Sequence, residues 1–159
     1  MLDHLTLKVS DLDKAKAFYT AALKPLGYGV MMEFEQYAGL GAGKPDLWLK
    51  KDPENVRPTH VALTADERAL VDLFYEAAIG AGATDNGKPG VRTDYHPTYY
   101  AAFVLDADGN NLEVVCHAAP GQARSTSKRA ARRPAAKKAA AKRKPARAAA
   151  KRGKGRGRR

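Results

Sequence analysis

The stretch HLTLKVSDLDKAKAFYTAAL at residues 4–23 decides the fold, because it returns in altered form as HVALTADERALVDLFYEAAI at residues 60–79. A histidine, His4 or His60, opens each stretch, and a Phe-Tyr pair followed by two alanines lies at the same distance from it, at an offset of 56 positions. Self-similarity at one fixed offset indicates two copies of a single structural unit.

Each copy begins with a short strand, expected over residues 4–9 and 60–63. Alternation in these strands places the leucines and valines on one face and the histidine on the other. An amphipathic helix follows in each copy. Ser10 is expected to cap the first helix and Pro25 to end it.

The second helix carries the signals of a capping box and of a buried stripe. Thr64 and Glu67 have the spacing of the box. The stripe follows the spacing 0, 3, 4 and 7 and consists of Leu70, Leu73, Phe74 and Ala77.

Three short strands follow each helix. They are expected over residues 28–34, 36–40 and 46–50 in the first copy, and over 84–86, 99–106 and 111–117 in the second. The order βαβββ, met twice, predicts an α+β fold of paired βαβββ modules whose curled mixed sheets surround a cleft. We place this domain at residues 1–119, with modules at about 1–56 and 57–119 and a tail at 120–159.

His4 and His60 occupy equivalent positions, so an approximate twofold axis would make them neighbours across the cleft. Glu113 lies between Leu112 and Val114, and alternation turns its carboxylate away from the packed face, towards the histidines. A lone buried carboxylate is costly, whereas two imidazoles and a carboxylate can share a divalent cation. The pattern predicts a metal site of His4, His60 and Glu113. The alternative is a metal-free cleft whose histidines hydrogen-bond a ligand.

The motifs HLTLKVSDLDKAKAFY, THVALTA and YYAAFVLDADGNNLEVV resemble the vicinal oxygen chelate superfamily of glyoxalases, bleomycin resistance proteins and extradiol dioxygenases, and the resemblance covers residues 1–119. It implies that His4, His60 and Glu113 are metal ligands, since members carry theirs on the first and last strands of paired modules. It also implies a symmetric homodimer and one divalent metal, Fe, Mn, Ni or Zn, open to two oxygens of a small substrate. A two-histidine, one-carboxylate set favours iron or manganese.

Trp48 aligns with Glu113, at the place where glyoxalase I enzymes carry a Glu or Gln, so their fourth ligand is missing. Two histidines and a glutamate resemble the extradiol dioxygenases and the fosfomycin-resistance thiol transferases. The segment LWLKK and Thr6 resemble the transferases in particular, which implies that Thr6 and Trp48 contact substrate. However, the stretch VVCHAAPGQ after Glu113 lacks the transferases' arginine, and the extradiol histidine base that should precede His60 is also missing.

The expected function is therefore a metal-dependent lyase, transferase or dioxygenase acting on a small oxygen-bearing substrate. Two alternatives remain open. One is a metal-free protein that sequesters a small molecule, and the other is a nucleoid-associated binding protein.

A polar aromatic cluster at residues 95–100 precedes the penultimate expected strand. In it His96 is a candidate general acid or base, Tyr100 a candidate proton donor and Tyr99 a candidate substrate contact. The alternative is a turn whose tyrosines pack on the sheet edge.

The charge is divided sharply along the chain. Residues 1–123 hold 11 Lys and Arg against 17 Asp and Glu, whereas residues 124–159 hold 17 Lys and Arg and no acid. This tail has too little apolar surface to fold, resembles linker-histone tails in composition, and is predicted to be disordered and to bind nucleic acid non-specifically. Its candidate contacts are Lys128, Arg129, Arg132, Arg133, Lys137, Lys138, Lys142, Arg143 and Lys144.

The sequence also predicts the compartment. The single cysteine, Cys116, excludes an intramolecular disulfide, and no apolar run approaches the ~18 residues of a membrane span. The chain opens on a strand rather than a signal peptide. We expect a soluble cytoplasmic protein, with nucleoid association as a consequence of nucleic-acid binding by the tail.

Overall fold

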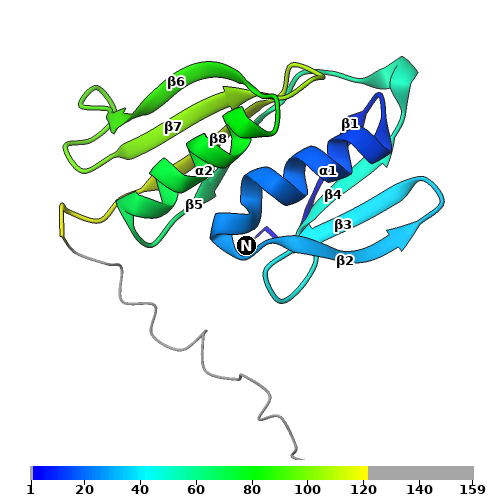
Figure 1. Ribbon diagram of the computed structural model, residues 1–159, viewed down its shortest axis with the longest axis horizontal. Coiled ribbons are helices and arrows are strands. Elements are labelled where there is room, and N and C mark those ends of the chain that lie inside the picture. Colours follow the sequence, from blue (N-terminus) through cyan, green and yellow to red (C-terminus); the bar gives the residue numbers. More distant parts are fainter. Residues whose placement is uncertain (1, 122–159) are drawn as a thin grey trace, which may run out of the picture. The chain divides into compact units, whose positions relative to one another are not determined.

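The computed structural model describes residues 2–121, which form two βαβββ modules (Figure 1). The first module comprises β1 (Leu5–Val9), α1 (Leu12–Leu23), β2 (Gly29–Phe34), β3 (Tyr37–Gly41) and β4 (Leu47–Lys51). The second comprises β5 (His60–Thr64), α2 (Arg68–Gly80), β6 (Thr84–Val91), β7 (Tyr100–Leu105) and β8 (Asn111–Cys116). Short 3-10 turns occupy Lys24–Leu26 and Pro53–Asn55. The predicted element order is confirmed.

Each module contains one mixed four-stranded sheet, in the order β1-β4-β3-β2 or β5-β8-β7-β6. The first and last strands of each module are parallel neighbours, and the remaining pairs are antiparallel. Thr6 pairs with Trp48 in the first sheet, and Ala62 pairs with Glu113 in the second. Since Thr6 and Ala62 are 56 positions apart, Trp48 and Glu113 occupy equivalent places.

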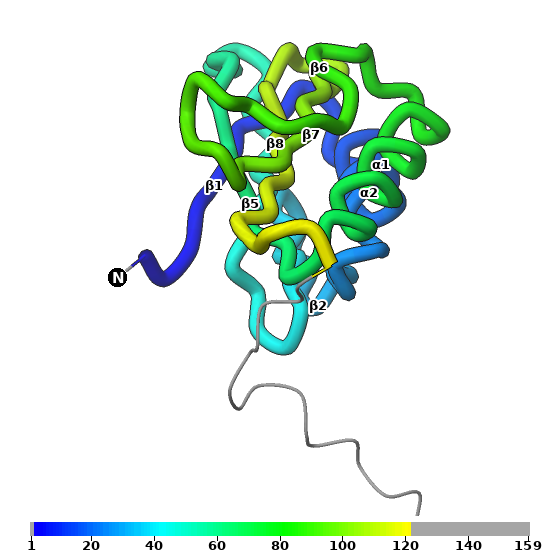
Figure 2. The backbone as a smooth tube through the Cα atoms, turned by 90° about the vertical axis from the view of Figure 1, so that its left-hand side faces the viewer, coloured from blue at the N-terminus to red at the C-terminus, as the bar shows by residue number. Residues whose placement is uncertain are grey.

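Both helices lie on the same side of the sheets and pack against each other (Figures 1 and 2). Alternate strand residues reach this side and form one core that runs through both modules, among them Leu7, Val9, Leu47, Leu49, Leu112 and Val114. The residues between them, such as Thr6, Trp48 and Glu113, therefore face the side without helices.

A buried hydrogen-bond network ties the first module to the second. The hydroxyl of Tyr19 in α1 donates to Oδ2 of Asp106, in the turn after β7, at 2.7 Å. Asn110 donates to both oxygens of the same carboxylate, through its amide side chain to Oδ2 and its backbone N–H to Oδ1, each at 2.8 Å. Burial, reinforced by Asp106, raises the pKa of Tyr19, so this phenol stays protonated and acts as a donor.

The helix starts differ from the sequence predictions. Asp11, not Ser10, caps α1, because its side chain accepts from the backbone N–H of Lys14. The expected capping box is also wrong: Thr64 ends β5, and Glu67 is itself the N-cap of α2 without a side-chain cap bond. The first strand ends at Val9 as predicted, whereas β5 runs one residue further than the prediction, to Thr64.

The buried face of α2 is rotated relative to the predicted stripe. Val71, Phe74 and Ala78 are buried, whereas Leu73 is 49% exposed. Strand β6 is longer than expected and reaches Val91 through two register shifts. Neither α1 nor α2, the helices of residues 2–121, is long and apolar enough to cross a membrane.

We predict that Tyr19→Phe lowers the free energy of unfolding by about 1–3 kcal/mol, because it removes one donor from a buried carboxylate. Urea unfolding followed by circular dichroism measures the loss. Tyr75→Phe is the matched control, because Tyr75 is the repeat equivalent of Tyr19 but is only half-buried. This substitution should lower the free energy of unfolding by less. An equal loss in both variants would contradict a special role for the Tyr19–Asp106 bond.

Candidate metal and substrate site

His60 and Glu113 meet on the helix-free face of the second sheet. Nε2 of His60 lies 2.8 Å from Oε2 of Glu113. The carboxylate is 2% exposed, while the His60 side chain is 53% exposed. The pair therefore combines a buried acid with an imidazole that remains accessible from solvent.

The second oxygen of this carboxylate is also engaged. The hydroxyl of Tyr99 donates to Oε1 of Glu113 at 2.5 Å. Burial and this hydrogen bond raise the pKa of Tyr99 to about 12, so the phenol is protonated at neutral pH. His117, exposed just after β8, packs its ring edge-on against Tyr99 with 5.1 Å between the ring centres.

Sequence reasoning missed the wall beside this pair. Phe103 pairs with Glu113 across β7 and β8, and its ring centre lies 6.2 Å from that of His60. The guanidinium of Arg92 lies over the Phe103 ring at 5.3 Å. The sequence could have predicted that Phe103 lies on the same face as Glu113, because Phe103 alternates with the buried Ala102 and Val104. Arg92 depends on the path of the loop that follows β6, for which the sequence holds no signal.

Three other predicted site residues gather in the first module. His4, Thr6 and Trp48 line an open cavity of about 530 Å³ on the first sheet. His4 is 54% exposed, and its Nδ1 lies 3.0 Å from Oδ1 of Asp3. Lys44 donates to Oδ2 of Asp3 at 2.9 Å, and the contacts with His4 and then Lys44 lower the pKa of Asp3.

Trp48 and Phe34 form an aromatic platform in the same cavity. Their rings are stacked, with centres 6.2 Å apart and planes inclined by 13°. Gly39 makes room for this arrangement, because a Cβ at that position would lie only 2.9 Å from the Trp48 ring. The indole therefore lies flat against β3, with Phe34 next to it 55% exposed.

The structure thus divides the predicted residues into two half-sites. His4, Thr6 and Trp48 lie on the first sheet, and His60, Tyr99 and Glu113 lie on the second. Within residues 2–121 no group of three His, Cys, Asp or Glu side chains is close enough to hold a metal ion. One chain brings His60 and Glu113 together but does not bring His4 to them.

Glu113 hydrogen-bonds to His60 and Tyr99, not to either of the two residues predicted as catalytic. The Tyr100 hydroxyl donates to Oδ1 of Asp72 in α2 at 2.7 Å, which places this phenol on the helix side of β7. His96 is exposed in the loop before β7, and its Nδ1 lies 3.0 Å from Oγ1 of Thr98.

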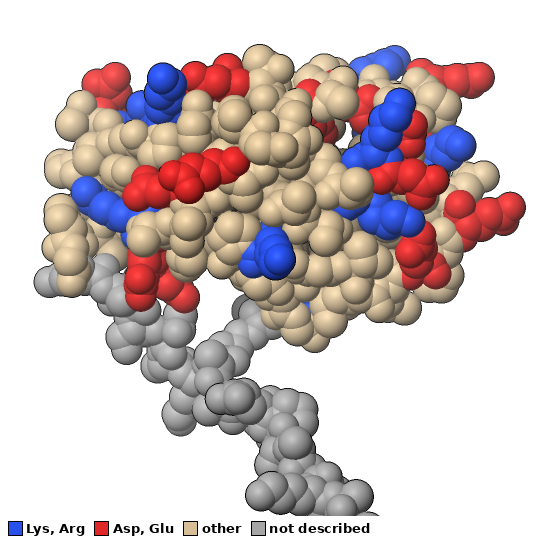
Figure 3. Space-filling view, viewed as in Figure 1, with Lys and Arg blue, Asp and Glu red and all other residues tan. Residues whose placement is uncertain are grey.

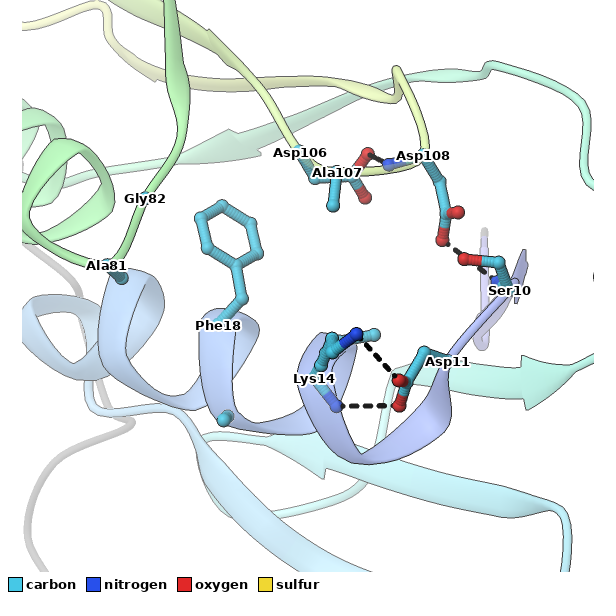
Figure 4. Close-up of a pocket in the computed structure, with 11 residues that line it drawn as sticks. Ser10, Asp11, Lys14, Phe18, Ala81, Gly82, Asp106, Ala107 and Asp108 are labelled. Carbon is cyan, nitrogen blue, oxygen red and sulfur yellow. Dashed lines mark hydrogen bonds and ion pairs between the residues drawn. The ribbon is translucent and has the colours of Figure 1, made fainter.

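A separate cavity of about 540 Å³ opens between α1 and the turn after β7. The Phe18 ring points into it, and the backbone N–H of Ser10 donates to Asp108 at its rim (Figure 4). This cavity contains none of the predicted site residues, and it marks a seam between the modules on the helix side.

The predicted nucleic-acid contacts of the tail lie outside the described residues. The folded part carries an excess of acid, and in the view of Figure 3 its acidic and basic side chains are interspersed. The visible face therefore offers no continuous basic surface to a polyanion.

The described residues define a class of protein with two βαβββ modules, each carrying a group of candidate site residues on its helix-free face. The chain belongs to the glyoxalase/bleomycin resistance protein/dioxygenase superfamily, whose family profile matches residues 1–114. The resemblance inferred from the motifs is confirmed at this level.

Among its relatives, metallothiol transferase FosB from Shouchella clausii (strain KSM-K16) is 30% identical over 118 residues, which are 71% of this chain and 77% of that protein. A glyoxalase/bleomycin resistance protein from Albidiferax ferrireducens T118 has a similar fold, with a TM-score of 0.63 at 23% identity, over 72% of this chain and 96% of the other. Lactoylglutathione lyase from Agrobacterium tumefaciens has a TM-score of 0.56 at 21% identity, over 71% and 90% of the two chains.

We predict that Gly39→Ala displaces Trp48, because the added methyl group would overlap the indole ring. Trp48 is the single tryptophan of the chain, so its fluorescence maximum and its quenching by acrylamide report the displacement directly. Gly29→Ala is the control in the same sheet, since a Cβ there meets no atom within 4 Å. Unchanged fluorescence in Gly39→Ala would contradict the close contact of Trp48 with β3.

Proposed function

We propose that this protein is a divalent-metal-dependent enzyme that chelates a small substrate through two neighbouring oxygens. The observation that carries the proposal is the contact of His60 with Glu113 at 2.8 Å on an accessible sheet face. The assigned superfamily and the name of the FosB relative, a metallothiol transferase, support it.

The chemistry of the donor pair fits a metal ion. Two adjacent ligands bound at about 2.0–2.2 Å to one ion, at a right angle, lie about 3 Å apart. The 2.8 Å between Nε2 of His60 and Oε2 of Glu113 is close to that value. A cation would also balance a carboxylate that is almost fully buried, in place of an ion pair with the imidazole.

We propose His4 of a second copy as the third ligand. His4 meets the requirements of a metal-binding histidine, because Asp3 engages Nδ1 and leaves Nε2 for the ion. The helix-free faces carry exposed apolar side chains, among them Phe34 at 55% and Tyr95 at 66%. A homodimer that places the first sheet of one copy against the second sheet of the other would cover both faces and complete two equivalent sites.

In this arrangement the substrate lies between the two half-sites. The metal, when bound, supplies Lewis acidity to the chelated oxygens. Trp48 and Thr6 form one wall, and Phe103 forms the other, with Arg92 positioned for an anionic group. Trp48 occupies the place of a glyoxalase I acid, which favours transferase-like or dioxygenase-like chemistry over isomerisation.

The loop at residues 92–99 supplies the remaining polar groups of the proposed site. Its Tyr99 phenol faces the centre, whereas Tyr100 faces α2, so the proposal gives Tyr100 no part in the chemistry. His96 keeps its proposed role as acid or base, since its loop borders the same face.

The proposed centre predicts that His4→Ala, His60→Ala and Glu113→Ala each lose bound metal, because each removes one of three ligands. Metal analysis of purified protein by inductively coupled plasma mass spectrometry measures the content. Thr98→Ala, a substitution in the bordering loop, is the control and should retain metal. Stoichiometric metal in all three ligand variants would refute the centre.

A mixing experiment tests whether the centre is shared between copies. When His4→Ala and Glu113→Ala chains are unfolded together and refolded, mixed dimers regain one intact site, or about a quarter of all sites if pairing is random. A centre built within one chain would give no recovery.

The basic tail supports a second function, non-specific nucleic-acid binding that tethers the enzyme. All 17 cations of residues 124–159 lie in one run without acids, and cations in such a run displace the counterions of phosphates. Because the folded part is acidic overall, the tail would carry this binding alone.

The tail prediction is measured by gel shift with DNA and RNA. Removal of residues 124–159 should abolish binding. For the full chain, log K of binding should fall by roughly 0.9 per contacted phosphate for each unit of log salt concentration. Full-length Glu113→Ala is the control and should bind as the wild type does. Unchanged affinity after truncation would reject the tail as the binding element.

A further inference from the structure

We infer that Tyr99 is a positioning residue that fixes Glu113 through one carboxylate oxygen and leaves the other as the metal-binding atom. The inference rests on the metal centre proposed above. It assigns Tyr99 a role different from the substrate contact expected from the sequence.

The two oxygens of Glu113 have different partners. Oε1 accepts the hydrogen bond from the Tyr99 hydroxyl, and Oε2 faces Nε2 of His60. A carboxylate can bind a cation through one oxygen or through both. A phenol that occupies Oε1 disfavours the two-oxygen mode and turns Oε2 towards the histidine.

Tyr99 is itself held firmly enough to position another group. Its backbone N–H donates to the carbonyl of His96 at 3.0 Å, and its carbonyl accepts from the N–H of Arg92 at 2.7 Å. The rings of Tyr95 and His117 each pack edge-on against its ring, with 5.1 Å between ring centres. These contacts hold the backbone and the ring of Tyr99 independently of Glu113.

The consequence for the centre is an additional open coordination position. If Glu113 contributes one oxygen, the ion keeps one more place for substrate than it would with a two-oxygen glutamate. Partners of metal ligands commonly affect affinity by about 10–100-fold, because they orient the ligand before the ion arrives.

Tyr100 provides an internal control. It is adjacent in sequence, it is similarly half-buried, and its hydroxyl also donates to a carboxylate, that of Asp72 at 2.7 Å. Its bond lies on the helix side of the same strand, away from His60 and Glu113. A general loss of stability would affect both variants, whereas a positioning effect is confined to Tyr99.

The experiment compares Mn²⁺ affinity in wild type, Tyr99→Phe and Tyr100→Phe by competition with a fluorescent chelator. Thermal melting of each metal-free protein checks the fold. We expect Tyr99→Phe to bind Mn²⁺ about 10–100-fold more weakly, and Tyr100→Phe to remain within about twofold of wild type. Tyr99→4-aminophenylalanine, which returns an N–H donor at the same ring position, should recover most of the affinity.

Equal affinities in wild type and Tyr99→Phe, or equal losses in the two Phe variants, would overturn the inference while leaving the metal centre intact. Failure of the 4-aminophenylalanine variant to recover, when its melting temperature matches wild type, would overturn it as well. A wild-type protein that binds no Mn²⁺, Fe²⁺, Ni²⁺ or Zn²⁺ would instead refute the centre on which the inference rests.

Discussion

The contact between α1 and α2, with the buried bond from Tyr19 to Asp106 at its end, determines which surfaces of this protein are free. Each helix covers one face of its own sheet, and the two helices then cover each other. Both helices therefore lie on the same side of the two sheets. The opposite faces of both sheets remain available, and they carry every polar and aromatic side chain of the two half-sites.

The repeat at an offset of 56 made most of the fold predictable from the sequence. It indicated the order of elements, and a separate alignment of the last strand of each copy matched Trp48 with Glu113, because strand alternation follows from local pattern. The first residues of the helices were harder to predict from the sequence. Asp11 and Ser10 are both good caps, and the sequence leaves the first helical residue open within one or two positions. The buried face of α2 likewise depends on contact with α1, so Leu73 fits the stripe in sequence yet lies exposed.

The site was predictable where it depends on strands and less so where it depends on loops. Glu113 and His60 meet because β5 and β8 are parallel neighbours. Strand alternation predicted their shared face, but not this pairing. The sequence does not show which of the neighbouring Tyr99 and Tyr100 faces Glu113, because that depends on the residue at which β7 starts. The proposed joining of His4 to this pair depends on how whole sheets associate, and no local pattern in the sequence encodes that association.

The outer strands β2 and β6 have a further consequence for association. Both are sheet edges, both shift register through irregular backbone, and β6 contains Pro89, which has no N–H to offer a neighbouring strand. An edge of this kind resists the addition of a foreign strand, even though β2 exposes Met31, Met32 and Phe34. Backbone irregularity on these two edges therefore works against strand-by-strand growth there, while the exposed apolar side chains of β2 stay accessible.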